Sequence, residues 1–109
     1  MMYQRSKLAA VAALTAGLLG GSVSQAHALP VPITGHFTAD GVYIHKTPHV
    51  NSARLGEGFR NQHVEVHCQT EGDVVQGSNI WFYLTDQTTH VTGYSSSKFV
   101  AVSQTPPHC

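Results

Sequence analysis

The chain has 109 residues, which is enough for one domain and too few for two. Its six basic and six acidic side chains give a formal net charge of zero when the histidines are neutral. This balance excludes the clustered lysines and arginines with which nucleic-acid-binding proteins neutralise phosphates. Two cysteines, ten glycines and five prolines indicate a small β-rich domain rather than a protein of long helices.

The first segment has the three-part layout of a secretory signal peptide. Two basic residues among the first seven precede an apolar run from 8 to 19, and Ala26 and Ala28 frame a small-residue cleavage site. The run is shorter than the roughly 20 residues that a membrane-spanning helix needs. We therefore expect residues 1–28 to be a cleaved signal peptide that leaves no stable membrane anchor. The mature protein is then secreted to the cell exterior, where the cell wall is one place for it to associate.

The two cysteines, Cys68 and Cys109, both lie in the expected mature chain. A domain this small buries too little surface to be stable without reinforcement, and disulfides persist in the oxidising compartments that exported proteins reach. Two cysteines allow one internal pairing, so we expect a Cys68–Cys109 disulfide. The alternatives are two free thiols or a bond to another chain.

The mature chain is expected to begin with an extended lead-in over residues 29–40, because its prolines oppose a helix. After residue 41, short apolar alternations separated by turn residues predict a small all-β barrel or sandwich. The expected strands are Val42–Ile44, His63–Cys68, Ile80–Thr85, Val91–Tyr94 and Phe99–Val102. The expected turns are Thr47–Pro48, Glu71–Asp73, Gly77–Asn79 and Asp86–Thr89.

Several stretches of this part of the chain carry a resemblance to a known family. They are Gly41–Pro48, Leu55–Gly56 followed by Val64–Val66, Trp81–Leu84 and Gly93–Val100. In this order they resemble the strands of a bacterial SH3-like (SH3b) domain, and the cysteine pair is similar to that of small secreted actinobacterial versions. Asn61 replaces a family glycine, and asparagine tolerates the left-handed backbone that a turn needs there. The resemblance implies an SH3-like barrel of about five to six short strands over residues 41–109, and a cell-wall peptide or another protein as its ligand.

The phase of the strands divides the apolar residues between two faces. The expected core consists of Val42, Ile44, Leu55, Val64, Val66, Phe82, Leu84 and Val100. The aromatic residues Tyr43, Trp81, Tyr83 and Tyr94 then belong to the opposite face. Aromatic rings offer a large contact area at low entropic cost, so these four residues are candidates for lining a ligand-binding groove. The alternative is that loops such as 35–40 cover the rings and form a second small core.

Three further side chains share one face of an expected strand, namely His63, Glu65 and His67. Imidazole and carboxylate groups suit zinc or copper, which makes these residues weak candidates for metal ligands. The two histidines are about 13 Å apart along an extended strand, so one metal ion cannot easily take both. The alternative is a solvated polar face.

The sequence shows no active site. Ser95 and Lys98 have the spacing of a serine nucleophile and its base, but the companion motifs of that enzyme class are absent. We therefore expect a secreted, monomeric, non-catalytic binding module without a cofactor or a nucleic-acid partner. Its expected ligand is a cell-wall peptide or glycan, or an extracellular protein. The alternative is a metal-binding protein that uses its surface histidines.

Overall fold

The computed structural model describes residues 31–109, so the expected signal peptide and the first residues of the lead-in lie outside the described residues. The described part contains strands and one short 3-10 helix. They are β1 (Ile33–Phe37), β2 (Val42–His45), β3 (Arg54–Gly58), β4 (His63–Val75), β5 (Ser78–Asp86), β6 (Thr92–Ser96), η3 (Ser97–Phe99) and β7 (Val100–Val102). Within residues 31–109, no helix has the length and apolar character that a membrane crossing requires.

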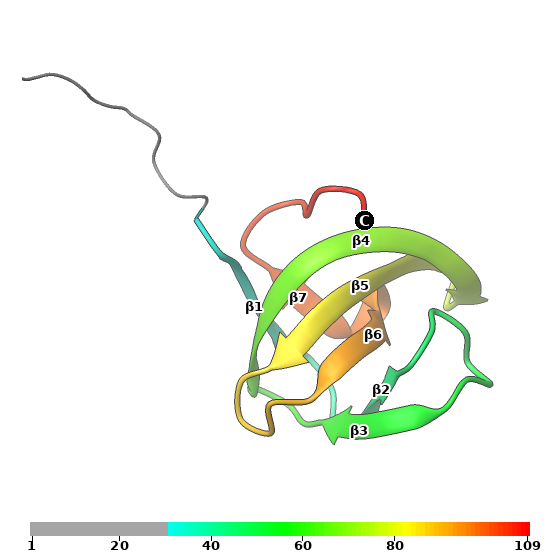
Figure 1. Cartoon of the computed structure of the whole chain (residues 1–109), viewed down its shortest axis with the longest axis horizontal. Helices are drawn as coiled ribbons and strands as arrows, with labels where there is room; N and C mark the ends of the chain where they lie inside the picture. The colour runs from blue at the N-terminus through cyan, green and yellow to red at the C-terminus, as the bar shows by residue number, and fades with distance from the viewer. Residues whose placement is uncertain (1–30) are drawn as a thin grey trace, which may run out of the picture. The chain divides into compact units, whose positions relative to one another are not determined.

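The strands pair antiparallel in one seven-stranded sheet, in the order β3-β2-β6-β5-β4-β1-β7 (Figure 1). The expected all-β class is confirmed. The strand count exceeds the expected five to six because part of the lead-in forms β1, which pairs with both β4 and β7. Gly35 permits this position, since a Cβ atom there would lie 2.2 Å from the Ala101 carbonyl oxygen. The residues that end the lead-in therefore belong to the sheet.

The core lies on the inner face of the curled sheet. Its buried members are Ile33, Phe37, Val42, Ile44, Val64, Val66, Phe82, Leu84 and Val100. Seven of the eight expected core residues are among them, but the prediction for Leu55 is wrong because its side chain is 47% exposed. Gly56 pairs with Ile44 and Arg54 with His45, so Leu55 is an extra residue in β3 without a partner in β2. Such a bulge rotates the side chain away from the core.

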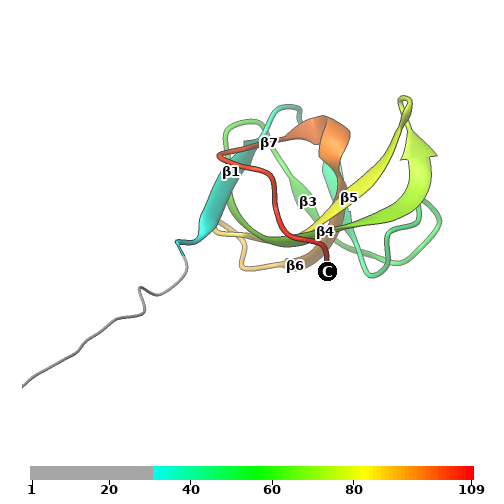
Figure 2. The same cartoon turned by 90° about the horizontal axis from the view of Figure 1, so that it is seen from above.

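The β4–β5 hairpin is longer than the sequence pattern indicated, and it projects from the sheet in Figure 2. Its two-residue loop is Gln76–Gly77, with φ angles of 48° and 83°. Two positive φ angles are typical of the tight turn that matches the twist of antiparallel strands. The expected turn at Glu71–Asp73 is wrong, because these residues continue β4 across an irregularity in its pairing with β5. The sequence predicted a turn at Gly77–Asn79. The observed turn begins one residue earlier, at Gln76, and ends at Gly77.

Three other expectations concern local boundaries. Asn61 takes the left-handed conformation predicted for it, with φ of 70°. Phe99 belongs to η3 rather than to β7, because the Ser96 hydroxyl accepts a hydrogen bond from the Lys98 N–H and caps a helical turn there. The expected loop after β5 is present, and the Asp86 carboxylate accepts hydrogen bonds from the Thr88 and Thr89 N–H groups. Asp86 is fully buried, and its Oδ2 has no hydrogen-bond partner.

The C-terminal tail returns to the outer edge of β4, and the expected Cys68–Cys109 disulfide is confirmed. The Gln69 N–H donates to the Pro107 carbonyl and the Cys109 N–H donates to the Gln69 carbonyl, each at 2.8 Å. His108 Nε2 lies 3.1 Å from Glu71 Oε1. β1 pairs with residues 63–66 on this edge of β4, and the tail pairs with the next part of the same edge, at Gln69.

Replacing Cys109 with serine should destabilise the domain while leaving the sheet intact. The disulfide closes a loop with a sequence separation of 41, which corresponds to about 4 kcal/mol in the chain-entropy treatment. For a domain of this size, the melting temperature should fall by more than about 15 °C. Calorimetry with far-UV circular dichroism is the measurement, and the reduced wild-type protein should match the variant. Equal melting temperatures for oxidised wild type and variant would contradict the prediction.

The pairing of Glu71 with His108 should make tail docking depend on pH. The hydrogen bond between them lowers the pKa of Glu71 and raises the pKa of His108. The stabilisation by Glu71 is lost as pH falls through its lowered pKa, and that by His108 is lost as pH rises through its raised pKa. Both are fully present between the ordinary values of 4.5 and 6.5. Both groups are exposed, so the effect should be small.

Melting temperatures of wild type and a His108→Gln variant should therefore differ most in mildly acidic buffer and converge in alkaline buffer. His63→Gln, which alters another exposed histidine, is the matched control and should show no such convergence. A wild-type advantage that grows with rising pH would contradict the assignment.

Candidate functional site

The aromatic residues singled out by strand phase do lie on the face opposite the core. Trp81 and Tyr83 alternate with the core residues of β5, and Tyr94 is the cross-strand partner of Tyr83 on β6. Tyr43 lies between two core residues of β2 and is 39% exposed. The alternation rule therefore placed these residues on the correct side of their strands.

The four residues divide into two groups instead of forming one groove. Tyr83 and Tyr94 pack on each other with ring centroids 4.9 Å apart, and His67 packs on Tyr83 at 5.6 Å. Tyr43 and Trp81 are instead joined through His45, whose ring lies 6.1 Å from the first and 5.7 Å from the second, both edge to face. Tyr43 and Trp81 line a groove, whereas Tyr83 and Tyr94 are not among the residues that line it.

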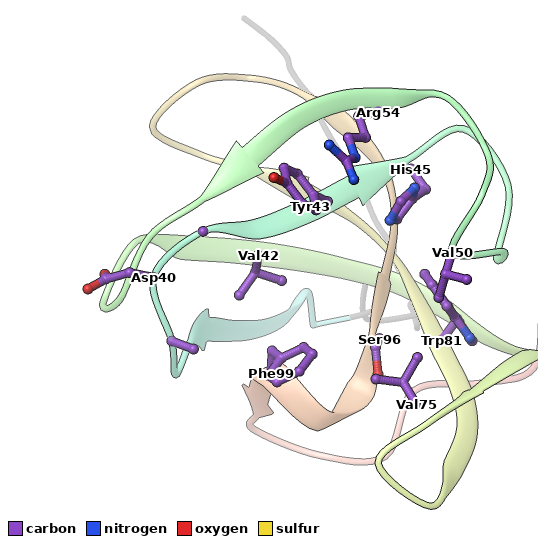
Figure 3. Close-up of a pocket in the computed structure, with 12 residues that line it drawn as sticks. Asp40, Val42, Tyr43, His45, Val50, Arg54, Val75, Trp81, Ser96 and Phe99 are labelled. Atoms are coloured by element: carbon purple, nitrogen blue, oxygen red, sulfur yellow. The ribbon is translucent and has the colours of Figure 1, made fainter.

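This groove has a volume of about 290 Å³ and opens between β2, the loop after it, and the end of the β4–β5 hairpin (Figure 3). Its lining residues are Ala39, Asp40, Gly41, Val42, Tyr43, His45, Val50, Arg54, Val75, Trp81, Ser96 and Phe99. Most of the lining is apolar or aromatic, and a few polar groups lie among it. That composition is typical of sites for small ligands or for one end of a larger ligand.

Trp81 forms the floor of the groove and is also a structural residue, with only 2% of its surface exposed. Its indole N–H donates to the Asp73 carbonyl at 2.8 Å. Gly72 passes directly over the ring, since a Cβ atom there would lie 2.8 Å from Trp81 Cδ1 and 2.1 Å from the Pro48 carbonyl oxygen. The cover comes from β4 and the loop after β2, and not from residues 35–40 as the sequence suggested. The sequence left two alternatives for these aromatic residues, an open groove or a second small core. Trp81 belongs to a small core, whereas Tyr43 is an exposed residue of the groove.

His45 contributes a polar atom to the groove that the sequence analysis did not identify. Its side chain is 6% exposed, and Nδ1 lies 3.1 Å from the Ser52 carbonyl oxygen. A carbonyl accepts only, so Nδ1 carries the proton in this contact and the neutral ring presents Nε2 as an acceptor. Within residues 31–109, His45 Nε2 has no hydrogen-bond partner. The only sequence signal for this role is the position of His45 two residues after Tyr43.

Arg54 lies at the same end of the groove, opposite His45 in the β2–β3 pairing. Its guanidinium carbon is 3.9 Å from the centroid of the Tyr43 ring, which is a cation–π contact. Among the described residues, no carboxylate lies within salt-bridge distance of Arg54. Asp40 lies at the other end of the groove, where its Oδ1 accepts a hydrogen bond from the Arg60 N–H (Figure 3). The groove is therefore basic at one end and acidic at the other.

The histidine-bearing face of β4 has a different arrangement. His67 Nε2 lies 2.9 Å from the Thr85 hydroxyl, and His63 lies opposite His36 of β1, where both line a second depression. Glu65 is half-buried between Thr34 and Thr85 in the sheet register. In the part of the chain that the structure describes, no three side chains of the metal-ligating types gather closely enough to hold a metal ion.

The Ser95 and Lys98 pair also has a structural context. Ser95 is fully buried, and its hydroxyl donates to the Tyr43 carbonyl at 2.9 Å. This bond ties β6 to β2 beneath the groove. Lys98 is exposed on η3. The serine hydroxyl thus serves the pairing of two strands.

In comparisons with protein-family models, curated proteins and solved structures, nothing matched this chain.

Trp81→Ala should destabilise the domain strongly, because the indole fills the space beneath Gly72. Truncating a buried tryptophan costs about 3–5 kcal/mol. Trp81→Phe keeps an aromatic ring but leaves the Asp73 carbonyl without its donor, so its cost should be smaller, about 1–3 kcal/mol. Urea denaturation followed by circular dichroism measures both variants. An unchanged midpoint for Trp81→Ala would show that the indole is not part of the packed structure.

Proposed function

We propose that this protein is an exported, monomeric, non-catalytic binding module, and that its ligand is a cell-wall peptide or glycan or an extracellular protein. The groove at Tyr43 carries the proposal, because it combines an apolar lining with a histidine nitrogen, Nε2 of His45, that has no hydrogen-bond partner among the described residues. A ligand that enters the groove with a hydrogen-bond donor can bind this nitrogen without displacing a contact made within residues 31–109. The resemblance of the chain to bacterial SH3-like domains points to the same class of function.

The dimensions of the groove support a ligand that is larger than the groove itself. Its volume of about 290 Å³ lies at the lower end of the range for small-molecule sites, which corresponds to one or two residues of an extended ligand. Two lining side chains also carry exposed apolar surface, since Val50 is 46% and Tyr43 is 39% exposed. Apolar surface at the rim of a groove favours a partner that continues past it.

Export is supported by two independent observations. The first is the charged start, apolar run and small-residue cleavage site of residues 1–28. The second is the Cys68–Cys109 disulfide, a bond that persists where the environment is oxidising.

Tyr43→Ala should lower retention of the purified domain on isolated bacterial cell walls by at least about tenfold, because the exposed ring is the groove wall that a ligand meets first. Phe59→Ala is the matched control, since Phe59 is 45% exposed and lies outside the groove. Both variants should keep the wild-type circular dichroism spectrum. Sedimentation assays in the presence and absence of a chelator measure the retention.

Equal losses for Tyr43→Ala and Phe59→Ala would contradict a role for the groove. Retention that survives Tyr43→Ala but disappears with the chelator would instead favour the metal-binding alternative at His63, Glu65 and His67.

A further inference from the structure

Resting on the proposed function, we propose that the groove binds the free carboxyl end of a peptide whose last side chain is apolar. The terminal residue of a peptide presents three features close together: a carboxylate, the amide N–H that precedes it, and a side chain. The basic end of the groove offers one group for each of these features. They are the Arg54 guanidinium, His45 Nε2 and the apolar floor around Trp81.

The Arg54 guanidinium is held in place before any ligand arrives. The cation–π contact holds it over the Tyr43 ring, and no carboxylate of the described residues lies within salt-bridge distance of its N–H groups. A guanidinium donates two parallel hydrogen bonds that match the two oxygens of a carboxylate. Preorganising the cation reduces the entropic cost of binding.

His45 supplies the acceptor beside this cation. Arg54 and His45 are cross-strand partners, and partners of this kind have Cβ atoms about 4.5–5.5 Å apart. The contact between Nδ1 and the Ser52 carbonyl leaves Nε2 as a hydrogen-bond acceptor. The amide N–H of a terminal residue is a donor that is separated from its own carboxylate by a single Cα atom. The amide N–H of the peptide can therefore donate to His45 Nε2 while its carboxylate binds the neighbouring Arg54 guanidinium.

The remaining lining favours an apolar side chain and a single negative charge. Besides Trp81, the apolar side chains of Val50, Val75 and Phe99 line the groove. Asp40 at the far end would repel a second anionic group. Residues 29–109 contain four basic and six acidic side chains, so the domain as a whole does not attract a polyanion. These charges favour a peptide end over a phosphate-rich or sulfate-rich polymer.

The single tryptophan of the chain provides the measurement, since Trp81 lies in the groove itself. The probes are N-acetyl-glycyl-glycyl-leucine and its C-terminal amide, which differ in the terminal charge. Titration of the intact disulfide-bonded domain should change Trp81 fluorescence with the free acid at millimolar concentration or below. The amide should bind at least about tenfold more weakly, which corresponds to the loss of one charge-assisted interaction.

Arg54→Gln should abolish the difference between acid and amide, and Arg54→Lys should retain only part of it because the two-pronged geometry is lost. Arg60→Gln is the matched control, since it removes the same charge from an exposed arginine outside the groove. Arg54 is exposed, so these variants should stay folded, which chemical-shift spectra verify.

Equal binding of acid and amide would overturn the carboxylate inference and leave groove binding itself in place. Equal binding of the acid by wild type and Arg54→Gln would also overturn it. No fluorescence or chemical-shift response to either probe would overturn this ligand class, whereas the proposed function is decided separately by the cell-wall retention of Tyr43→Ala.

Discussion

The groove depends on one residue at the bend of β4, Asp73, which connects three parts of the chain. Its carbonyl accepts the Trp81 indole N–H, and its own N–H donates to the Pro48 carbonyl at 3.1 Å. Its carboxylate accepts the Val50 N–H and lies 2.9 Å from His49 Nδ1. These contacts lower the pKa of Asp73, the hydrogen bond with His49 being the largest cause. The hairpin, the loop after β2 and the indole are thus held against each other, and the space between them is the groove.

This arrangement explains why a tryptophan can be a structural residue and still line a groove. Gly72 lies against one side of the indole, and a side chain at this position would collide with both Trp81 and Pro48. The other side forms the floor of the groove. A floor that is part of a packed cluster does not move when a ligand arrives, so less ordering is needed on binding.

The alternation of apolar and polar residues in the sequence was enough to predict the fold class and the faces of several strands. The all-β class, the positions of most strands, the disulfide and the inward and outward phase of β2 and β5 all follow from period-2 patterns and from cysteine number. The sequence did not indicate that β4 continues through Glu71–Asp73, because a glycine between two acidic residues is also a typical turn. It is the contact of Gly72 with Trp81, nine residues along the chain, that keeps this segment extended. Similarly, His45 and Arg54 meet only because a bulge places them opposite each other. Contacts of this kind depend on register, which a single sequence does not encode locally.

The return of the C-terminal tail along β4 has a consequence for how the molecule meets other copies of itself. Beyond the residues paired with β1, the outer edge of β4 would present unpaired backbone groups around Gln69, and such an edge is a template for strand addition by another chain. Pro107 and Cys109 occupy those groups, and the disulfide keeps them there. Reduction of the disulfide would release the tail and leave this edge open to pairing with another chain. The bond that stabilises the fold thereby also protects this edge from pairing with another chain.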